Sequence, residues 1–165
     1  MDVELKSLAL LERVQLKFLR RMLGVGRRSM KAVLFSETGI WPIKYRRVHL
    51  ALKYLCYLLQ LDKRRPASNA LLSESIMLAR KGQLCWINDL RIVLSRLYVP
   101  VHLDISADLQ VAAVEIAMKD VEKSMEAWID HEIGTSSRVS GLLVGRMEMD
   151  SDTGKLVKKT LDFRH

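Results

Sequence analysis

Apolar residues recur every three or four positions over residues 3–23, which is the spacing of an amphipathic helix. One row contains Leu16, Leu19 and Leu23. A second row surrounds the polar Gln15 and contains Leu8, Leu11, Phe18 and Met22. Gly24 follows and supplies the left-handed residue that ends many helices.

The next two helices are predicted over residues 30–38 and 42–61. Ser29 suits the N-cap of the first, and Gly39 suits its end. Pro42 fits the first turn of the second. That helix is apolar almost all round, so we expect it to be the most buried one. The expected core residues on it are Val48, Leu52, Leu55, Leu58 and Leu59.

Further helices are predicted over 69–80 and 85–97, with Gly82 between them, and over 106–131. Residues 132–165 read as a loosely ordered tail, with a possible β-hairpin over 143–161. The pattern therefore predicts an all-α protein. We expect an irregular bundle of about six helices in a domain spanning 1–131, followed by the short tail.

The composition fits a globular, intracellular chain. A length of 165 residues is enough for one ordinary domain with a core. The only two cysteines, Cys56 and Cys85, lie among apolar residues and predict free thiols in a reducing compartment. The most apolar run, VHLALKYLCYLLQL, is ~14 residues long, and a membrane span needs ~20. We therefore expect no membrane partner.

The net charge of +8 is unevenly placed. Residues 1–65 hold 15 Lys and Arg against 5 Asp and Glu, whereas residues 66–165 hold 12 against 14. A basic half suggests a polyanionic partner, although a solubilising surface would show the same imbalance. Polar residues also form a single stripe on the third predicted helix, at Arg46, His49, Lys53, Tyr57 and Gln60. A basic stripe with an aromatic residue suits a nucleic-acid backbone and a base, but a solvated helix face would look alike.

Catalytic and cofactor motifs are not evident. Gly24-Val25-Gly26 follows a predicted helix rather than a strand. We therefore interpret it as the end of that helix and the turn to the next one, and not as a phosphate-binding loop. The four histidines and two cysteines show no zinc-ligand spacing. DSDTGK at 150–155 resembles the start of a calcium loop, but Lys155 stands where that loop needs glycine and Leu161 where it needs a bidentate glutamate, so a turn is predicted there. We expect no catalytic residue, cofactor or metal.

Several motifs follow one another along the chain. The first is Leu11-Glu12-x-x-Gln15-x-x-Phe18-Leu19-Arg20-x-x-Leu23-Gly24. The second is Glu37-Thr38-Gly39-x-x-Pro42, followed by the basic apolar helix. Later segments are Cys85-Trp86-x-x-Asp89-Leu90, Glu122 to Trp128, Gly145-Arg146-Met147-Glu148 and Phe163-Arg164-His165. Together these segments cover most of the chain, and their order and spacing resemble the region downstream of the polymerase core in reverse transcriptases of non-LTR (LINE-like) retrotransposons.

The resemblance implies a thumb-like or connecting segment rather than an enzyme. The aromatic-x-Asp-Asp hairpin of the polymerase site does not occur in the sequence, so the chain looks like a fragment of a larger polyprotein. We expect DNA flanking the coding segment to encode that hairpin upstream and a Cys/His knuckle downstream. The remainder of the reverse transcriptase would then be one partner, and RNA or an RNA–DNA hybrid the other. The expected backbone contacts are Arg20, Arg21, Arg27, Arg28, Arg46 and Lys53.

Two alternatives stay open from the sequence. The chain could be a basic helical module that binds an acidic protein and no nucleic acid, or a retroelement remnant without function. Trp41, Trp86 and Trp128 each lie at the edge of an apolar pattern. They are therefore predicted to anchor the core rather than to stack on bases.

Overall fold

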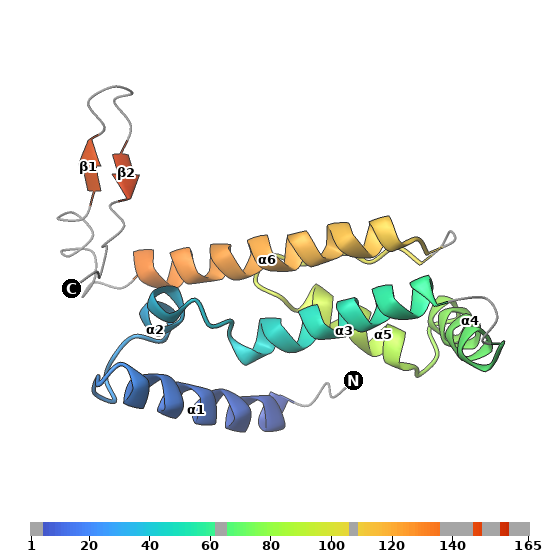
Figure 1. The fold of residues 1–165 in the computed structure, drawn as a ribbon, viewed down its shortest axis with the longest axis horizontal. Helices are drawn as coiled ribbons and strands as arrows, with labels where there is room; N and C mark the ends of the chain where they lie inside the picture. The colour runs from blue at the N-terminus through green and yellow to red at the C-terminus, as the bar shows by residue number, and fades with distance from the viewer. Residues whose placement is uncertain (1–4, 62–65, 106–108, 136–146, 150–155, 159–165) are drawn as a thin grey trace. The chain divides into compact units, whose positions relative to one another are not determined.

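The computed structural model of the chain describes residues 5–61, 66–105, 109–135, 147–149 and 156–158. It confirms an all-α fold with six helices (Figure 1). The helices are α1 (Leu5–Met22), α2 (Lys31–Thr38), α3 (Ile43–Gln60), α4 (Pro66–Arg80), α5 (Trp86–Ser95) and α6 (Val111–Gly134).

The chain divides into two compact units, 1–129 and 130–165. In the second unit, β1 (Met147–Met149) pairs with β2 (Leu156–Lys158) in an antiparallel ladder that places Glu148 opposite Val157. The predicted turn at 150–155 lies outside the described residues. A folding boundary at residue 131 stays a prediction.

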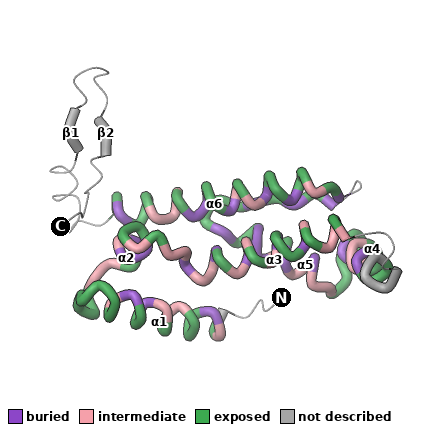
Figure 2. Tube along the Cα trace, viewed as in Figure 1, coloured by how far each residue is buried: buried purple, intermediate pink, exposed green. Residues whose placement is uncertain are grey.

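The main core lies where α3, α5 and α6 meet within the first unit, and Figure 2 shows the buried positions along these helices. The buried side chains include Tyr45, Val48, Leu52, Leu55, Ile87, Leu90, Val93, Leu94, Val114, Ala117 and Val121. A smaller cluster joins α1 to α2 and contains Leu16, Leu19, Leu34 and Phe35. Trp128 packs against both clusters, and its ring lies 6.1 Å from that of Phe35 and 6.2 Å from that of Tyr45.

The expectation that α3 is the most buried helix is wrong. Val48, Leu52 and Leu55 are fully buried as predicted, but Leu58 and Leu59 are only partly buried. On another side of α3, Leu50, Tyr54 and Tyr57 are each more than half exposed. The shorter α5 has the larger buried fraction, because the elements packed on α3 cover only part of its circumference. An all-round apolar pattern therefore overstated its burial.

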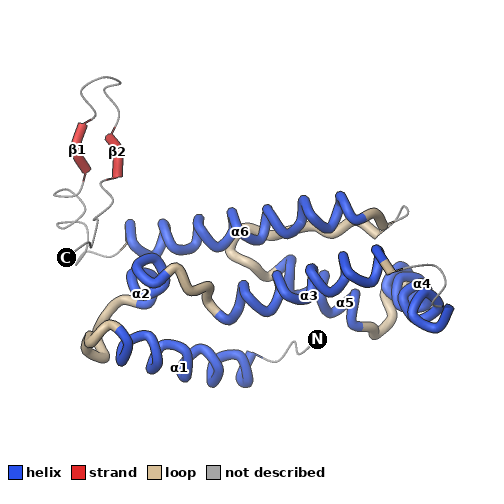
Figure 3. The backbone as a smooth tube through the Cα atoms, viewed as in Figure 1, coloured by secondary structure: helices blue, strands red, loops and turns tan. Residues whose placement is uncertain are grey.

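The segment before α6 is extended rather than helical (Figure 3). Val101, Leu103 and Ile105 are buried while His102 and Asp104 are exposed, which is the two-residue alternation of an extended chain. Leu109 and Gln110 are also non-helical, so the predicted start at 106 is wrong and α6 begins at Val111. The other long helices match their predicted ranges to within about three residues, the usual scatter of boundaries.

The connection between α1 and α2 differs from the predicted cap. The residue before α2 is Met30, which provides no side-chain cap, and Ser29 instead donates its hydroxyl to the Gly26 carbonyl at 2.9 Å. Gly39 does end α2 as predicted. It has φ of 63°, and its N–H donates to the Phe35 carbonyl at 3.0 Å.

Truncation of Leu55 tests the position of this core. Leu55 is 0% exposed, so Leu55→Ala should lower the free energy of unfolding by ~2–5 kcal/mol. Leu50→Ala on the same helix is the matched control and should cost under ~0.5 kcal/mol, because Leu50 is 54% exposed. Denaturant unfolding measures both. Similar costs for the two variants would place the core on another side of α3.

Candidate nucleic-acid interface

The Gln15 side chain fixes α1 against the start of α3. Its amide nitrogen donates to the Trp41 carbonyl at 2.7 Å, and its amide oxygen accepts from the Ile43 N–H at 2.9 Å. Pro42, the residue before α3, offers no side-chain cap, so Gln15 supplies a partner for one of the free N–H groups at the helix start. Sequence reasoning missed this role. The sequence signal that could have indicated it is the position of Gln15, a polar residue within an apolar row of the helix.

A second polar tie holds α6 to the core. Ser124 is 0% exposed, and its hydroxyl accepts from the Val99 N–H at 2.9 Å. The Tyr45 hydroxyl donates to the Ser124 carbonyl at 3.4 Å. Burial raises the pKa of Tyr45, so its hydroxyl stays protonated and remains a donor. Trp128, one turn further along α6, is thereby held between the two clusters.

Most of the basic residues expected to meet nucleic acid are exposed. Of the six predicted contact residues, Arg21, Arg27, Arg28, Arg46 and Lys53 are all exposed. Arg13 and Lys17 on α1 are exposed as well. Within the described part of the chain, none of these seven side chains forms an ion pair. Three further cations of the basic half, Lys63, Arg64 and Arg65, lie outside the described residues.

Arg20 differs from the other predicted contacts because it is used within the fold. Its Nε donates to the Ser29 hydroxyl at 3.2 Å, and its Nη2 donates to the Ser29 carbonyl at 3.3 Å. The guanidinium thus braces the turn that carries Arg27 and Arg28. Lys31 is also engaged, because its Nζ lies 2.8 Å from the Glu12 carboxylate.

On α3 the charge of the predicted stripe comes from Arg46 and Lys53 rather than from His49. His49 is half-buried, its ring lies 4.8 Å from that of Trp41, and its Nδ1 is buried with no hydrogen-bond partner among the described residues. Burial, and then the neighbouring Lys53, lowers the pKa of His49, while Glu122 opposes the shift. The imidazole is therefore neutral at pH 7.

The three tryptophans pack as core anchors. Trp41, Trp86 and Trp128 are each partly buried against the main cluster. Trp41 also lies beside His49, and Trp86 lies beside Tyr54 with their ring centroids 6.0 Å apart. Exposed aromatic surface on α3 comes instead from Tyr54 and Tyr57.

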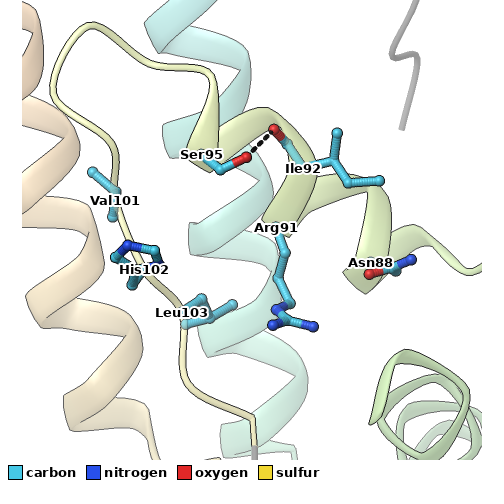
Figure 4. Close-up of a pocket in the computed structure, with 7 residues that line it drawn as sticks. All are labelled: Asn88, Arg91, Ile92, Ser95, Val101, His102 and Leu103. Carbon is cyan, nitrogen blue, oxygen red and sulfur yellow. Dashed lines mark hydrogen bonds between the residues drawn. The ribbon is translucent and has the colours of Figure 1, made fainter. Parts of the chain in front are cut away.

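A pocket of about 280 Å³ opens between α5 and the extended segment before α6 (Figure 4). Its polar lining includes Asn88, Arg91, Ser95 and His102. The Ser95 hydroxyl donates to the Ile92 carbonyl at 2.9 Å, so it is bound to its own helix rather than to a base.

The cysteines act as structural residues. Cys85 caps α5, because its Sγ accepts from the Asn88 N–H at 3.4 Å and donates to the Ser75 carbonyl at 3.3 Å. Burial, assisted by Glu115, raises the pKa of the Cys56 thiol, which favours its protonated form. Among the described residues, no cluster of His, Cys, Asp and Glu is arranged to hold a metal ion.

No helix in the described ranges combines the length and apolar character that a membrane crossing requires. Comparison with protein-family models, with curated proteins and with solved structures finds no significant match. The resemblance to non-LTR reverse transcriptases therefore rests on the motifs of this chain.

The two hydrogen bonds of Gln15, here called the Gln15 clamp, predict that removing this side chain lowers the stability of the fold. Gln15→Ala removes both bonds and leaves the Trp41 carbonyl and the Ile43 N–H without their partner. The free energy of unfolding should fall by ~1–3 kcal/mol, because each of the two part-buried hydrogen bonds contributes ~0.5–1.5 kcal/mol. Gln60→Ala, at the exposed end of α3, should change it by under ~0.5 kcal/mol. Equal midpoints for both variants in urea would show that the clamp adds nothing.

Proposed function

We propose that this chain is a non-catalytic helical module that contacts the backbone of RNA or of an RNA–DNA hybrid through its basic half. In the protein that its motifs resemble, this would be the segment after the polymerase core, bracing the template-primer. The contacts would go to phosphates and would not read sequence. Arg21, Arg27, Arg28, Arg46 and Lys53 are the proposed contact residues.

The observation that carries this proposal is that these five cations are exposed and form no ion pair among the described residues. Described residues 5–61 contain 12 Lys and Arg but only the acids Glu12 and Glu37. Glu12 is already paired with Lys31. Clustered like charges repel one another and raise the local positive potential. A polyanion relieves that repulsion and releases its own counterions, which is the main source of non-specific nucleic-acid affinity.

Three of these cations lie close together in the chain at the first connection. Arg21 lies in the last turn of α1, Arg27 and Arg28 lie in the turn that follows, and the Arg20–Ser29 bonds hold that turn. Arg46 and Lys53 lie on α3, whose start is tied to α1 by Gln15. The cations therefore sit on elements whose relative placement is fixed by polar contacts.

A salt titration tests the proposal. Affinity of the chain for an RNA–DNA hybrid is measured at several salt concentrations. Replacing Arg21, Arg27, Arg46 and Lys53 together by Gln removes four phosphate contacts, each contributing a slope of about 0.7–0.9 in log K against log salt. The slope should flatten by roughly three units, with a similar loss on every sequence.

The matched control removes the same number of charges elsewhere. Lys81, Arg91, Arg96 and Lys119 are all exposed and lie outside the basic half, so their joint replacement by Gln should change the slope much less. Equal flattening by both sets would show that affinity follows net charge alone, and the proposed surface would be abandoned.

The outward face of α1 favours a second function, as a module that binds an acidic protein. Its apolar row is only partly used in the core, since Leu8, Leu16 and Leu19 are buried. Five large apolar side chains of α1 are each more than half exposed, and they are Leu10, Leu11, Val14, Phe18 and Met22. Exposed apolar patches beside charges commonly mark protein interfaces. The neighbouring cations Arg13, Lys17 and Arg21 would select an acidic partner.

An acidic amphipathic helical peptide separates the two functions. Val14→Gln with Phe18→Gln should weaken binding of that peptide at least about tenfold, because apolar anchors dominate helix docking. The same variant should bind the RNA–DNA hybrid as before, since both substitutions leave the charges intact. No binding of the peptide by the parental chain would remove this second function.

A further inference from the structure

The exposed face of α3 combines cations and aromatic rings in one row. Arg46, Leu50, Lys53 and Tyr57 follow one another at intervals of four, three and four residues, so they share one side of the helix. Tyr54 lies beside this row. From Arg46 to Tyr57 the row extends about 16 Å along the helix axis, at about 1.5 Å per residue.

The two tyrosines form a connected series of rings with Trp86. Tyr54 and Tyr57 are stacked, with ring centroids 6.4 Å apart and an interplanar angle of 28°. Tyr54 also contacts Trp86 at 6.0 Å, and Trp86 packs against the main core. Tyr54 and Tyr57 nevertheless remain 55% and 54% exposed. The rings are therefore held from one side and open to solvent on the other.

We infer that Tyr54 and Tyr57 are a stacking platform for unpaired bases, and that the α3 face prefers single-stranded nucleic acid over a fully paired duplex. Arg46 and Lys53 would hold the phosphates of the same strand. This inference rests on the proposed function, and it adds the strand state of the ligand and a contact that carries no charge.

Physical chemistry favours a single strand on this face. Base–aromatic stacking is tolerant of sequence because every base has a π-face, and a strand with unpaired bases can present those faces to a protein. In a duplex the base faces already stack on one another, so only the phosphates remain available to α3. An aromatic pair flanked by cations is the arrangement that binds single strands without sequence preference. An acidic peptide would use the cations but would leave the ring faces without a planar partner.

Two tyrosine variants of the full chain test the inference. Tyr54→Leu with Tyr57→Leu removes the rings but keeps apolar bulk, whereas Tyr54→Phe with Tyr57→Phe keeps the rings. Affinity is measured by fluorescence anisotropy on an oligouridine strand and on a fully paired RNA–DNA hybrid. On oligouridine, the leucine variant should lose at least about fivefold in affinity for each base that stacks. The phenylalanine variant should bind like the parental chain.

The salt dependence separates stacking from charge. The leucine variant should keep the parental salt slope on oligouridine, because it removes no phosphate contact. It should bind the hybrid as the parental chain does. Equal affinity of the leucine and phenylalanine variants for oligouridine would overturn the inference, and so would an equal loss on both ligands.

Failure of the inference is distinguishable from failure of the proposed function. If replacing the basic residues by Gln flattens the slope while the tyrosine variants bind normally, the cations bind nucleic acid and the platform does not exist. If the parental chain binds neither ligand, both proposals fail.

Ultraviolet crosslinking of the parental chain to a 5-bromouracil strand gives a readout that needs no variant. Crosslinks in the peptide carrying Tyr54 and Tyr57 support the platform, and crosslinks confined to other peptides contradict it.

Discussion

The two hydrogen bonds of Gln15 are the contact on which the arrangement of the basic half depends. A helix that starts after proline without a side-chain cap leaves N–H groups that need partners. Gln15 supplies one from 28 residues away, and it ties down the Trp41 carbonyl with the same amide. Because one planar group makes both bonds, it restrains distance and orientation together. Leu16 and Leu19 then pack on Leu34 and Phe35 beside this clamp. Polar pairing thus fixes the geometry, and apolar burial stabilises it.

Some polar side chains form hydrogen bonds within the fold while others stay exposed, and this difference determines which charges the surface presents. Ser124, Cys85 and Gln15 each satisfy backbone groups inside the first unit. Arg20 and Lys31 serve the turn between α1 and α2. The exposed cations Arg13, Lys17, Arg21, Arg27, Arg28, Arg46 and Lys53 form no ion pair among the described residues, whereas Lys44 and Arg47 are partly buried. Isolated surface charges contribute little to folding, so the proposed contact with an anion would cost the fold little.

Periodicity located the six helices, because the rows of Leu16 and Leu19 or Val114 and Val121 encode one buried face each. It could not tell which of two apolar rows on α1 is covered, since Leu11 and Phe18 repeat as regularly as their buried counterparts. Burial depends on which elements pack nearby, and that information is not local. The same limit applies to α3, where Leu50 and Tyr54 look like core residues in the sequence. Among candidate contacts, the charge pattern predicted Arg46 and Lys53, which are exposed, but it could not show that Arg20 is engaged within the fold or that burial lowers the pKa of His49.

The two sides of α3 explain how a small helical unit could present a binding surface of defined geometry. Val48, Leu52 and Leu55 are fully buried and fix the rotation of the helix about its axis. The rotation of the helix also places Arg46, Lys53 and Tyr57 on one exposed side, where Tyr57 stacks on Tyr54. Trp86 extends this restraint to Tyr54, because its ring joins the core to the exposed pair. Aromatic side chains have few rotatable bonds. When a strand binds them, these side chains would therefore lose less conformational entropy than lysine side chains would. Preorganisation by the core, more than the number of charges, would then decide how well this face distinguishes an unpaired strand from other polyanions.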